Sequence, residues 1–372
     1  MPGICHFNRR REIILCSNPI TRTYFIIVIL TLFYCEIFEH WVHRFQWKDL
    51  PSKNNDFGSE SNSLRILFVA DAQIQGVRYE LPGILGYITR LDSDRYLSRT
   101  FSHALAHSTP DVIIFMGDEL DEGSVSTDEE FKEMADRFHD LFYEQWVLEH
   151  GQKVLSLPGD NDVGGEGQDK FTAENMKRFM KSFPGNLTSY FKFLEVVQSN
   201  RMSNSLDFSY IPKRKVGNVR FLVSHVPITA FRGYYSKVLT ENSDMDIIFS
   251  AHEHKSMHLI TDRKSGKHLN TEKWENNDVW TMNVFANHNE LHEIMIPTCS
   301  YRMGVPQMGY GVANIDKNGR LFYTVYWLPS RFKQLFIYIG ILAAGVVIGI
   351  AQVCFPCCRK YFCTTYKKIH PV

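Results

Sequence analysis

The stretch Gly117-Asp118-Glu119-Leu120-Asp121-Glu122-Gly123 (GDELDEG) directly follows the apolar run Val112–Met116. Four other short apolar runs also end just before side chains that can bind metals, and these runs are Leu64–Ala70, Val154–Leu157, Val219–Ser224 and Ile247–Ser250. All five are rich in β-branched or aromatic residues and are bounded by turn-forming residues. This pattern predicts five β-strands.

Helical patterns separate the first of these strands. Asp92–His107 and Asp128–Leu148 both repeat apolar residues at the spacing of a helix. Strands that alternate with helices predict an α/β fold with an at least partly parallel sheet. Near the end of this region, Gly311–Tyr326 holds two apolar runs around Asp316–Gly319, which predicts a β-hairpin.

The ends of the predicted strands carry carboxylate, amide or imidazole groups. In chain order these groups belong to Asp71, Gln73, Asp118, Asp160, Asn161, His225, His252 and His254. A single such residue is commonly a helix N-cap or a structural histidine. Ligands of open α/β sheets collect beyond the carboxyl ends of strands. Five strand ends of this kind together therefore predict a metal site.

The donors suit a pair of divalent cations. Two such cations about 3.5–4 Å apart need a bridging carboxylate, and an activated water between them is the nucleophile. Asp118 is the expected bridge, and Gly117 and Gly159 would let the chain turn sharply beside the site. Carboxylate and imidazole donors without thiolate suit manganese, iron or zinc.

The order of these motifs resembles that of the calcineurin-like metallophosphoesterases, which is D-x-H, GDxxD, GNHD, H and GHxH. The similarity extends from Leu64 to about Tyr326. It implies a four-layer α/β/β/α sandwich with two manganese ions. More narrowly, GDELDEG between two flanking apolar segments resembles the members that act on GPI anchors. Those members remove an ethanolamine phosphate side chain from the second mannose, which supports transport of GPI-anchored proteins from the endoplasmic reticulum to the Golgi.

The resemblance also implies a role for each site residue. Asp71, Gln73 and His254 would bind the first metal, Asp160, His225 and His252 would bind the second, and Asp118 would bridge them. The two catalytic candidates are Asp121, which would orient the ligands, and Asn161, which would contact the phosphate.

Three positions depart from the family pattern. Gln73 replaces a histidine, which favours manganese or magnesium, and Asp160 replaces an asparagine. Asn161 replaces the histidine that can protonate the leaving group, and the loss of such an acid costs about 3–5 kcal/mol of transition-state stabilisation. Two alternatives stay open. His258, His288 or His292 could supply the proton, or the alignment could shift so that Asn161 is the ligand and Asp162 follows it.

Two apolar segments predict membrane spans. Leu335–Val353 contains 19 residues without a charge, close to the ~20 needed to cross a bilayer. Thr23–Phe38 is shorter and contains Glu36, but Tyr24 and Trp41 could lie in the two interfaces. A cleaved signal peptide is the alternative for this first segment, although no small-residue cleavage site follows it.

The charges that flank these segments predict the orientation. Arg9, Arg10, Arg11 and Arg22 precede the first segment, which places the N-terminus in the cytosol. The expected organisation is a cytosolic tail (1–22), a transmembrane helix (23–41), a linker (42–63), a lumenal metallophosphoesterase domain (64–330), a second transmembrane helix (334–355) and a cytosolic tail (356–372). We expect a membrane of the endoplasmic reticulum, the ER–Golgi intermediate compartment or the cis-Golgi.

Several short features fit this topology. Cys299 is the only cysteine in the lumenal region, so no disulfide can form within it. Asn186 begins an Asn-Leu-Thr glycosylation triplet. Cysteines 354, 357, 358 and 363 suit palmitoylation, with a zinc site as the alternative. The sequence from Lys368 to Val372 resembles a retrieval signal read by coat proteins, or is simply a basic tail.

Composition limits the function classes. The 41 basic residues balance the 41 acidic residues, which argues against nucleic acid as a partner. The main hypothesis is a membrane-anchored metal phosphodiesterase acting on the GPI glycan. Two alternatives remain: a catalytically weakened relative that binds phosphorylated glycan or cargo, and a phosphoesterase for another substrate.

Overall fold

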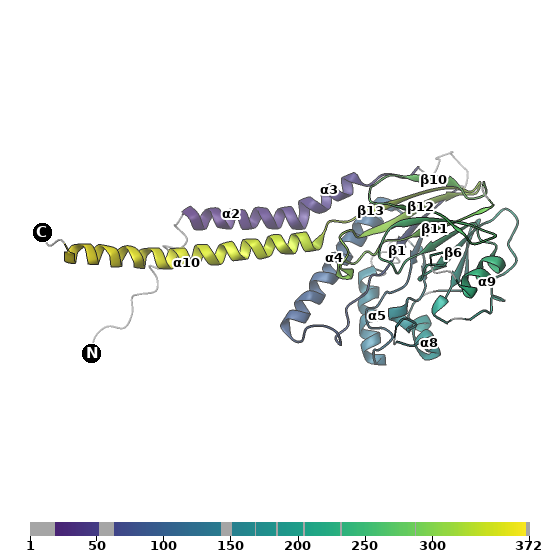
Figure 1. Cartoon of the computed structure of the whole chain (residues 1–372), viewed down its shortest axis with the longest axis horizontal. Coiled ribbons are helices and arrows are strands. Elements are labelled where there is room, and N and C mark those ends of the chain that lie inside the picture. Colours follow the sequence, from purple (N-terminus) through teal and green to yellow (C-terminus); the bar gives the residue numbers. More distant parts are fainter. Residues whose placement is uncertain are drawn as a thin grey trace. The chain divides into compact units, whose positions relative to one another are not determined.

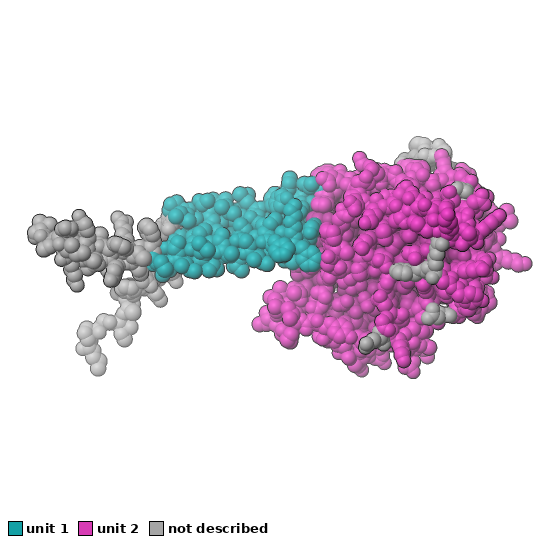
Figure 2. Space-filling view, viewed as in Figure 1, with its two compact units in different colours: residues 1–42, 330–372 teal, residues 43–329 magenta. Residues whose placement is uncertain are grey.

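The computed structural model (Figure 1) describes residues 19–51, 63–142 and 151–369, except residues 168, 184, 204, 231, 232 and 287. Side chains are described up to Cys354. The described chain forms two compact units, one of residues 1–42 and 330–372 and one of residues 43–329 (Figure 2). Residues 1–18 of the expected N-terminal tail, residues 52–62 of the linker and residues 370–372 of the retrieval-like signal lie outside what the structure describes, and the tail cysteines after Cys354 are described by their backbone alone.

The first sheet of the larger unit has the strand order β10-β13-β12-β1-β2-β3. Its strands are β1 (Ser63–Val69), β2 (Val112–Phe115), β3 (Lys153–Ser156), β10 (Trp280–Asn283), β12 (Gly309–Asp316) and β13 (Arg320–Trp327). Strands β1, β2 and β3 are parallel, whereas β12 and β13 form the predicted hairpin. The carboxyl ends of β1, β2 and β3 therefore meet at one edge.

The second sheet has the order β4-β5-β6-β7-β11-β8-β9. Its strands are β4 (Thr188–Phe191), β5 (Leu194–Ser199), β6 (Val219–Ser224), β7 (Ile247–Ser250), β8 (Met257–Asp262), β9 (His268–Lys273) and β11 (Glu290–Met295). Strands β5, β6, β7 and β11 are parallel, and the outer strands pair antiparallel. Only β6 and β7 of this sheet were expected from the sequence.

The main hydrophobic core lies between the two sheets. Ile66 and Phe68 from β1 pack in one buried cluster with Phe221 from β6 and Phe249 from β7. The rings of Phe68 and Phe249 stack with their centroids 4.4 Å apart. Burial of apolar surface contributes about 25 cal/mol per Å², so this cluster holds the sheets face to face.

Helices cover the outer faces. On the first sheet, Phe101 of α4 (Ile84–Ser108) and Phe138 of α5 (Asp128–Phe142) contact Phe115 of β2. On the second sheet, Leu239 of α9 (Tyr234–Ser243) joins a cluster with residues of β5, β6, β7 and β11. The predicted α/β sandwich is confirmed. The expected helix bounds were wrong at one end, because α4 begins at Ile84 rather than at Asp92.

Two helical segments of the described chain are long and apolar enough to cross a membrane, Pro19–Gln46, most of which belongs to the smaller unit, and Arg331–Cys354, which lies within it. They comprise α2 (Pro19–Phe33), a π-helical turn (Tyr34–Phe38), α3 (Glu39–Gln46) and α10 (Arg331–Ile369). Glu36, which interrupts the first apolar segment, accepts hydrogen bonds from Arg331 Nη1 at 2.8 Å and from the Tyr338 hydroxyl at 2.7 Å. The charge that weakened the sequence prediction is therefore paired.

Candidate metal centre

Five predicted ligands have left-handed backbone conformations. Their φ angles are 51° at Asp71, 46° at Gln73, 53° at Asp118, 69° at His252 and 58° at His254. A residue other than glycine in such a region costs about 1–3 kcal/mol, and strain of this kind concentrates at functional sites. Each of these residues lies just beyond a strand, so the sharp turns occur where the ligands are needed.

Two positions beside the site require glycine, one because of its backbone conformation and the other because no Cβ atom fits. Gly117 has a φ of 93°, which side chains disfavour. Gly159 is extended, but a Cβ atom there would clash with the Asp118 carboxylate. The expected role of Gly159 in a sharp turn is therefore corrected, because Gly159 instead allows Asp118 to approach the loop after β3.

Asp160, His225 and His252 form one group of converging donors. Asp160 Oδ1 lies 3.0 Å from His225 Nε2 and 3.0 Å from His252 Nδ1. The other ring nitrogen of His225, Nδ1, lies 2.9 Å from the carbonyl oxygen of Met116. A proton on Nδ1 satisfies that carbonyl, which leaves Nε2 as the ligating atom.

Asp71, Asp118 and His225 form a second group that shares His225 with the first. His225 Nε2 lies 3.4 Å from Asp118 Oδ1, and His254 Nε2 lies 3.7 Å from Asp71 Oδ1. The side-chain amide of Gln73 contacts Asp118 Oδ2 at 3.3 Å. The structure thus brings all seven predicted ligands together, although they come from five separate strand ends.

The charges within this cluster fit divalent cations. Both carboxylate oxygens of Asp71 are buried and have no hydrogen-bond partner among the described residues. Burial raises the pKa of Asp71 to about 8. An unpartnered buried carboxylate is unfavourable by at least about 1–3 kcal/mol, and a bound cation would remove that penalty. The orphaned Asp71 is therefore the observation that fits a metal.

The pKa values of Asp160 and His254 are both lowered. Burial opposes the charge on Asp160, yet hydrogen bonds from His225 and His252 hold the pKa of that carboxyl well below its usual range. Burial lowers the pKa of His254, which keeps its imidazole neutral and able to bind a metal.

Asn161 contacts the expected bridging residue. Its backbone N–H donates to Asp118 Oδ1 at 2.9 Å, and its side-chain Nδ2 donates to Oδ2 at 3.1 Å. Asp160, and not Asn161, lies between the two histidines, so the geometry favours the ungapped alignment. Asp162 accepts hydrogen bonds from the backbone N–H groups of Gly159 and Leu120, both at 2.9 Å, and so joins two loops of the site.

Asp121 pairs with a residue that the sequence analysis missed. Its carboxylate lies 3.6 Å from the Arg302 guanidinium, and Arg302 also pairs with Glu80. Burial raises the pKa of Asp121 to about 6, while Arg302 acts in the opposite direction. Arg302 lies far along the chain from GDELDEG, so no local pattern could have identified it. The orienting role of Asp121 stays a prediction.

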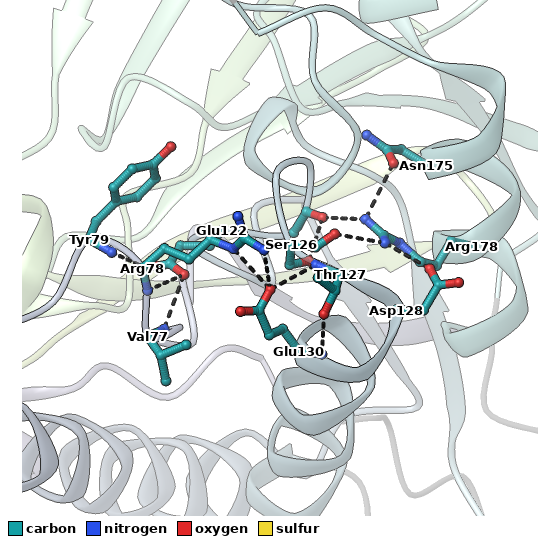
Figure 3. Close-up of polar contacts among 11 residues, drawn as sticks. Val77, Arg78, Tyr79, Glu122, Ser126, Thr127, Asp128, Glu130, Asn175 and Arg178 are labelled. Atoms are coloured by element: carbon teal, nitrogen blue, oxygen red, sulfur yellow. Dashed lines mark hydrogen bonds and ion pairs between the residues drawn. The ribbon is translucent and has the colours of Figure 1, made fainter.

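Two buried glutamates clamp the loops of the site. Glu122 accepts hydrogen bonds from the backbone N–H groups of Val77, Arg78 and Tyr79 at 2.8–3.1 Å (Figure 3). Glu293 of β11 accepts from the backbone N–H groups that follow His225, those of residues 228 and 229, at 2.8 and 2.7 Å. The sequence analysis missed both roles, although Glu122 stands within GDELDEG.

The alternative proton donors lie elsewhere. His258 Nε2 is 2.9 Å from His292 Nδ1, and the His258 ring stacks on Trp274. Burial lowers the pKa of His258 to about 3, so it is not protonated near neutral pH. His288 is exposed in the turn after β10. The lowered pKa therefore disfavours His258 as the missing acid.

Glu166 is a further acidic residue at the rim. Its Oε1 lies 3.9 Å from His252 Nε2, and interaction with Asp160 raises the pKa of Glu166. The sequence analysis missed it because it lies in the glycine-rich loop after α7 (Asp160–Val163), away from any strand end.

Comparisons with known proteins agree with this geometry. Residues 64–256, more than half of the chain, match the family model described as calcineurin-like phosphoesterase. The chain is 28% identical over 201 residues to Cell division control protein 1 of Saccharomyces cerevisiae, covering 49% of this chain and 38% of that protein. It is 27% identical over 199 residues to Metallophosphoesterase 1 of Cricetulus griseus, covering 52% of this chain and 47% of that protein.

The chain spans less than half the length of these two curated relatives. Among solved structures, a dimetal phosphatase from Danio rerio aligns with a TM-score of 0.37 and 10% identity, covering 70% of this chain and 98% of that chain. A likeness at this score carries no functional weight.

Proposed function

Because the chain belongs to the calcineurin-like phosphoesterase family, we propose that it is a metal-dependent phosphodiesterase with a dinuclear manganese centre. The proposed substrate is the ethanolamine phosphate on the second mannose of GPI anchors. The observation that carries the metal centre is the convergence of Asp71, Asp118, Asp160 and His225, with the Asp71 carboxylate left without a hydrogen-bond partner among the described residues. The substrate rests on GDELDEG, the two apolar helices and the relatives named Metallophosphoesterase 1.

The residues of the site would have separate roles in binding the metals and the phosphate. Bound divalent cations supply Lewis-acid charge to a phosphate group and lower the pKa of a water molecule. Gln73 offers an amide oxygen beside the carboxylates, a donor set that suits manganese better than a softer ion. The Met116 carbonyl fixes the ring of His225. Asn161 Nδ2, next to Asp118, would donate a hydrogen bond to the phosphate and stabilise its developing charge.

We further propose that the two apolar segments span the membrane and that the catalytic unit is lumenal. Pairing of Glu36 with Arg331 and Tyr338 supports a first span that contains a charge. Exposure of Asn186 makes its triplet available for glycosylation. Exposure of Cys354 supports palmitoylation at the end of the second span. Coat-protein retrieval and a home in the endoplasmic reticulum, the intermediate compartment or the cis-Golgi belong to the same proposal.

The catalytic proposal is tested on the purified full-length chain in detergent. We expect manganese-dependent hydrolysis of bis-(4-nitrophenyl) phosphate that the Asp118→Asn variant lacks. Metal analysis of both proteins accompanies the assay. Absence of turnover in wild-type protein that holds its metal would contradict the proposal.

The substrate is tested in cells that lack the protein. GPI-anchored proteins should leave the endoplasmic reticulum more slowly, and their glycans should retain the ethanolamine phosphate. Normal glycans and normal export would remove the GPI assignment while leaving phosphodiesterase activity intact.

One observation favours a second candidate function. Asn161, at the position of the catalytic acid, cannot donate a proton at neutral pH. The chain would then be a metal-dependent receptor for phosphorylated glycan or cargo. Metal-dependent binding of ethanolamine-phosphate mannoside without turnover would favour this function over catalysis.

A further inference from the structure

An exposed apolar segment begins at Val77, four residues after the candidate ligand Gln73. Its residues are Val77, Tyr79, Leu81, Ile84, Leu85, Tyr87, Ile88 and Leu91, which we call the apolar lobe. Their side chains are between 49% and 80% exposed. Scattered apolar residues are normal on a surface, but a contiguous group of this size marks an interaction site.

The lobe consists of a loop that contains Val77, Tyr79 and Leu81, followed by the first turns of helix α4. Ile84, Ile88 and Leu91 are spaced to lie on one side of α4. Further along the same helix, Leu97 and Phe101 are buried in the larger unit. The first turns of α4 extend outward from this unit (Figure 1). The apolar side chains in the first turns of α4 therefore face solvent, whereas those further along the helix are buried in the protein core.

Hydrogen bonds fix residues 77–79, at the start of the lobe, to Glu122. The Glu122 carboxylate, which accepts three backbone N–H groups there, comes from the loop that follows Asp118 (Figure 3). Gly76 approaches Glu122 so closely that a Cβ atom would clash with the carboxylate. Arg78 also pairs with Glu130 of α5, with Nη2 2.6 Å from Oε2. The lobe thus cannot move far without disturbing the loop that carries the bridging residue.

The composition of the lobe fits a lipid surface. Leucine and isoleucine are accompanied by Tyr79 and Tyr87, and tyrosine prefers the boundary between lipid and water. Arg78 and Arg90 flank the apolar side chains. Aliphatic residues with aromatic and basic neighbours in one short segment are typical of chains that lie in a membrane interface.

The short connection to the candidate spans favours a bilayer over another protein. Strand β13 ends at Trp327 and α10 begins at Arg331, so about 15 Å of extended chain at most separates them. If α10 spans the membrane, the end of β13 is held within that reach of the bilayer surface. A bilayer is then the partner that the chain itself would bring close to the larger unit.

We propose that the apolar lobe inserts into the leaflet beside the catalytic unit and thereby presents the phosphodiester of a lipid-linked substrate to the metal centre. The presentation of substrate rests on the proposed function, whereas insertion needs only the membrane anchors. Because Glu122 links the lobe to the loop of Asp118, insertion would fix the distance between the bilayer and the catalytic site.

The test uses the full-length chain in phosphatidylcholine vesicles that contain a phosphatidylcholine with a diazirine in its acyl chain. After irradiation, mass spectrometry maps the labelled peptides. We expect labelling of α10, which reports correct insertion, and of the segment from Val77 to Leu91. Peptides with Val216 or Leu269, which are also exposed, should stay unlabelled. Labelled α10 together with an unlabelled lobe would overturn the proposal.

A matched pair of variants sharpens the result. Ile84→Asp combined with Ile88→Asp should lower labelling of the lobe by about tenfold while α10 labelling is unchanged. Val216→Asp, a charge added at another exposed apolar residue, should change neither. Equal thermal unfolding midpoints show that both variants are folded. Diazirine cross-links do not require turnover, so lobe labelling in a protein without phosphodiesterase activity would refute the proposed function and leave insertion standing.

Discussion

Asp160 Oδ1 lies 3.0 Å from His225 Nε2, although the two residues follow strands in different sheets. Asp160 follows β3 of the first sheet, and His225 follows β6 of the second. Their contact exists only when the two sheets pack face to face. The hydrophobic core between the sheets is therefore what assembles the metal centre, and damage to that core should cost metal binding as well as stability.

Metal binding should stabilise the fold. A cation that binds the folded chain more tightly than the unfolded chain raises its stability in proportion to the logarithm of its concentration. We expect the unfolding midpoint of the chelator-treated protein to rise with added manganese. In Asp71→Asn this rise should be much smaller, because the orphaned carboxylate is gone. An equal rise in both proteins would show that manganese binds elsewhere.

Restoring the family histidine should increase activity. In Asn161→His the imidazole can protonate the leaving group, and a general acid contributes about 100-fold or more. The pH dependence of kcat should gain a new limb near the pKa of that histidine. Asn161→Ala is the control, and it should reduce activity below wild type because the hydrogen bond to phosphate is lost. No gain in Asn161→His with full metal content would show that the reaction does not lack an acid.

The buried pair of His258 and His292 predicts an acid-sensitive step in stability. Burial lowers the pKa of His258 from 6.5 to about 3, so the unfolded chain binds more protons between these values. Stability from this group is therefore complete above pH 6.5 and is lost as the pH falls toward 3. The slope approaches about 1.4 kcal/mol per pH unit. Urea unfolding at several pH values should show a slope smaller by about that amount in His258→Gln, and unchanged slopes would contradict the assignment.

A buried ion pair in the second sheet should matter far more than an exposed one. Arg220 and Glu195 are both almost completely buried, with Nη2 and Oε2 2.7 Å apart. Arg220→Met leaves a buried charge and should cost about 3–5 kcal/mol in the free energy of unfolding. The matched control is Lys132→Met, which breaks an exposed pair with Asp136 and should cost less than about 1 kcal/mol. Similar losses in the free energy of unfolding in both variants would contradict the expected difference between the buried and the exposed ion pair.

The lumenal orientation can be checked at Asn186. We expect the full chain, expressed in mammalian cells, to carry an N-glycan that endoglycosidase removes. Asn186→Gln should abolish that shift in electrophoretic mobility. A wild-type chain without a glycan whose Asn186 segment is instead reached by cytosolic labelling would place the catalytic unit on the other side.

The strands near the site could be predicted because they are buried on both faces. β6 and β7 are mostly apolar, and their bounds agree with the sequence prediction. β9 could not be predicted, since all six of its residues are exposed and its sequence His-Leu-Asn-Thr-Glu-Lys has no apolar alternation. The start of α4 was missed because its first apolar residues do not face the core.

The convergence of the candidate ligands could be predicted because a metal site requires particular side chains at strand ends. The loop clamps at Glu122 and Glu293 could not, since their partners are backbone N–H groups that any residue provides. The role of Arg302 could not be predicted for a different reason. Its contact with Asp121 depends on the packing of a distant loop, and no spacing in the sequence records that packing.

The most direct test is electron paramagnetic resonance of the full-length chain loaded with manganese, together with its metal content. A dinuclear centre predicts two manganese ions per chain and an exchange-coupled spectrum, because a shared carboxylate holds the ions about 3.5–4 Å apart. Asp118→Asn should lose the coupling. A spectrum of one isolated manganese ion per chain in the wild-type protein would contradict the account.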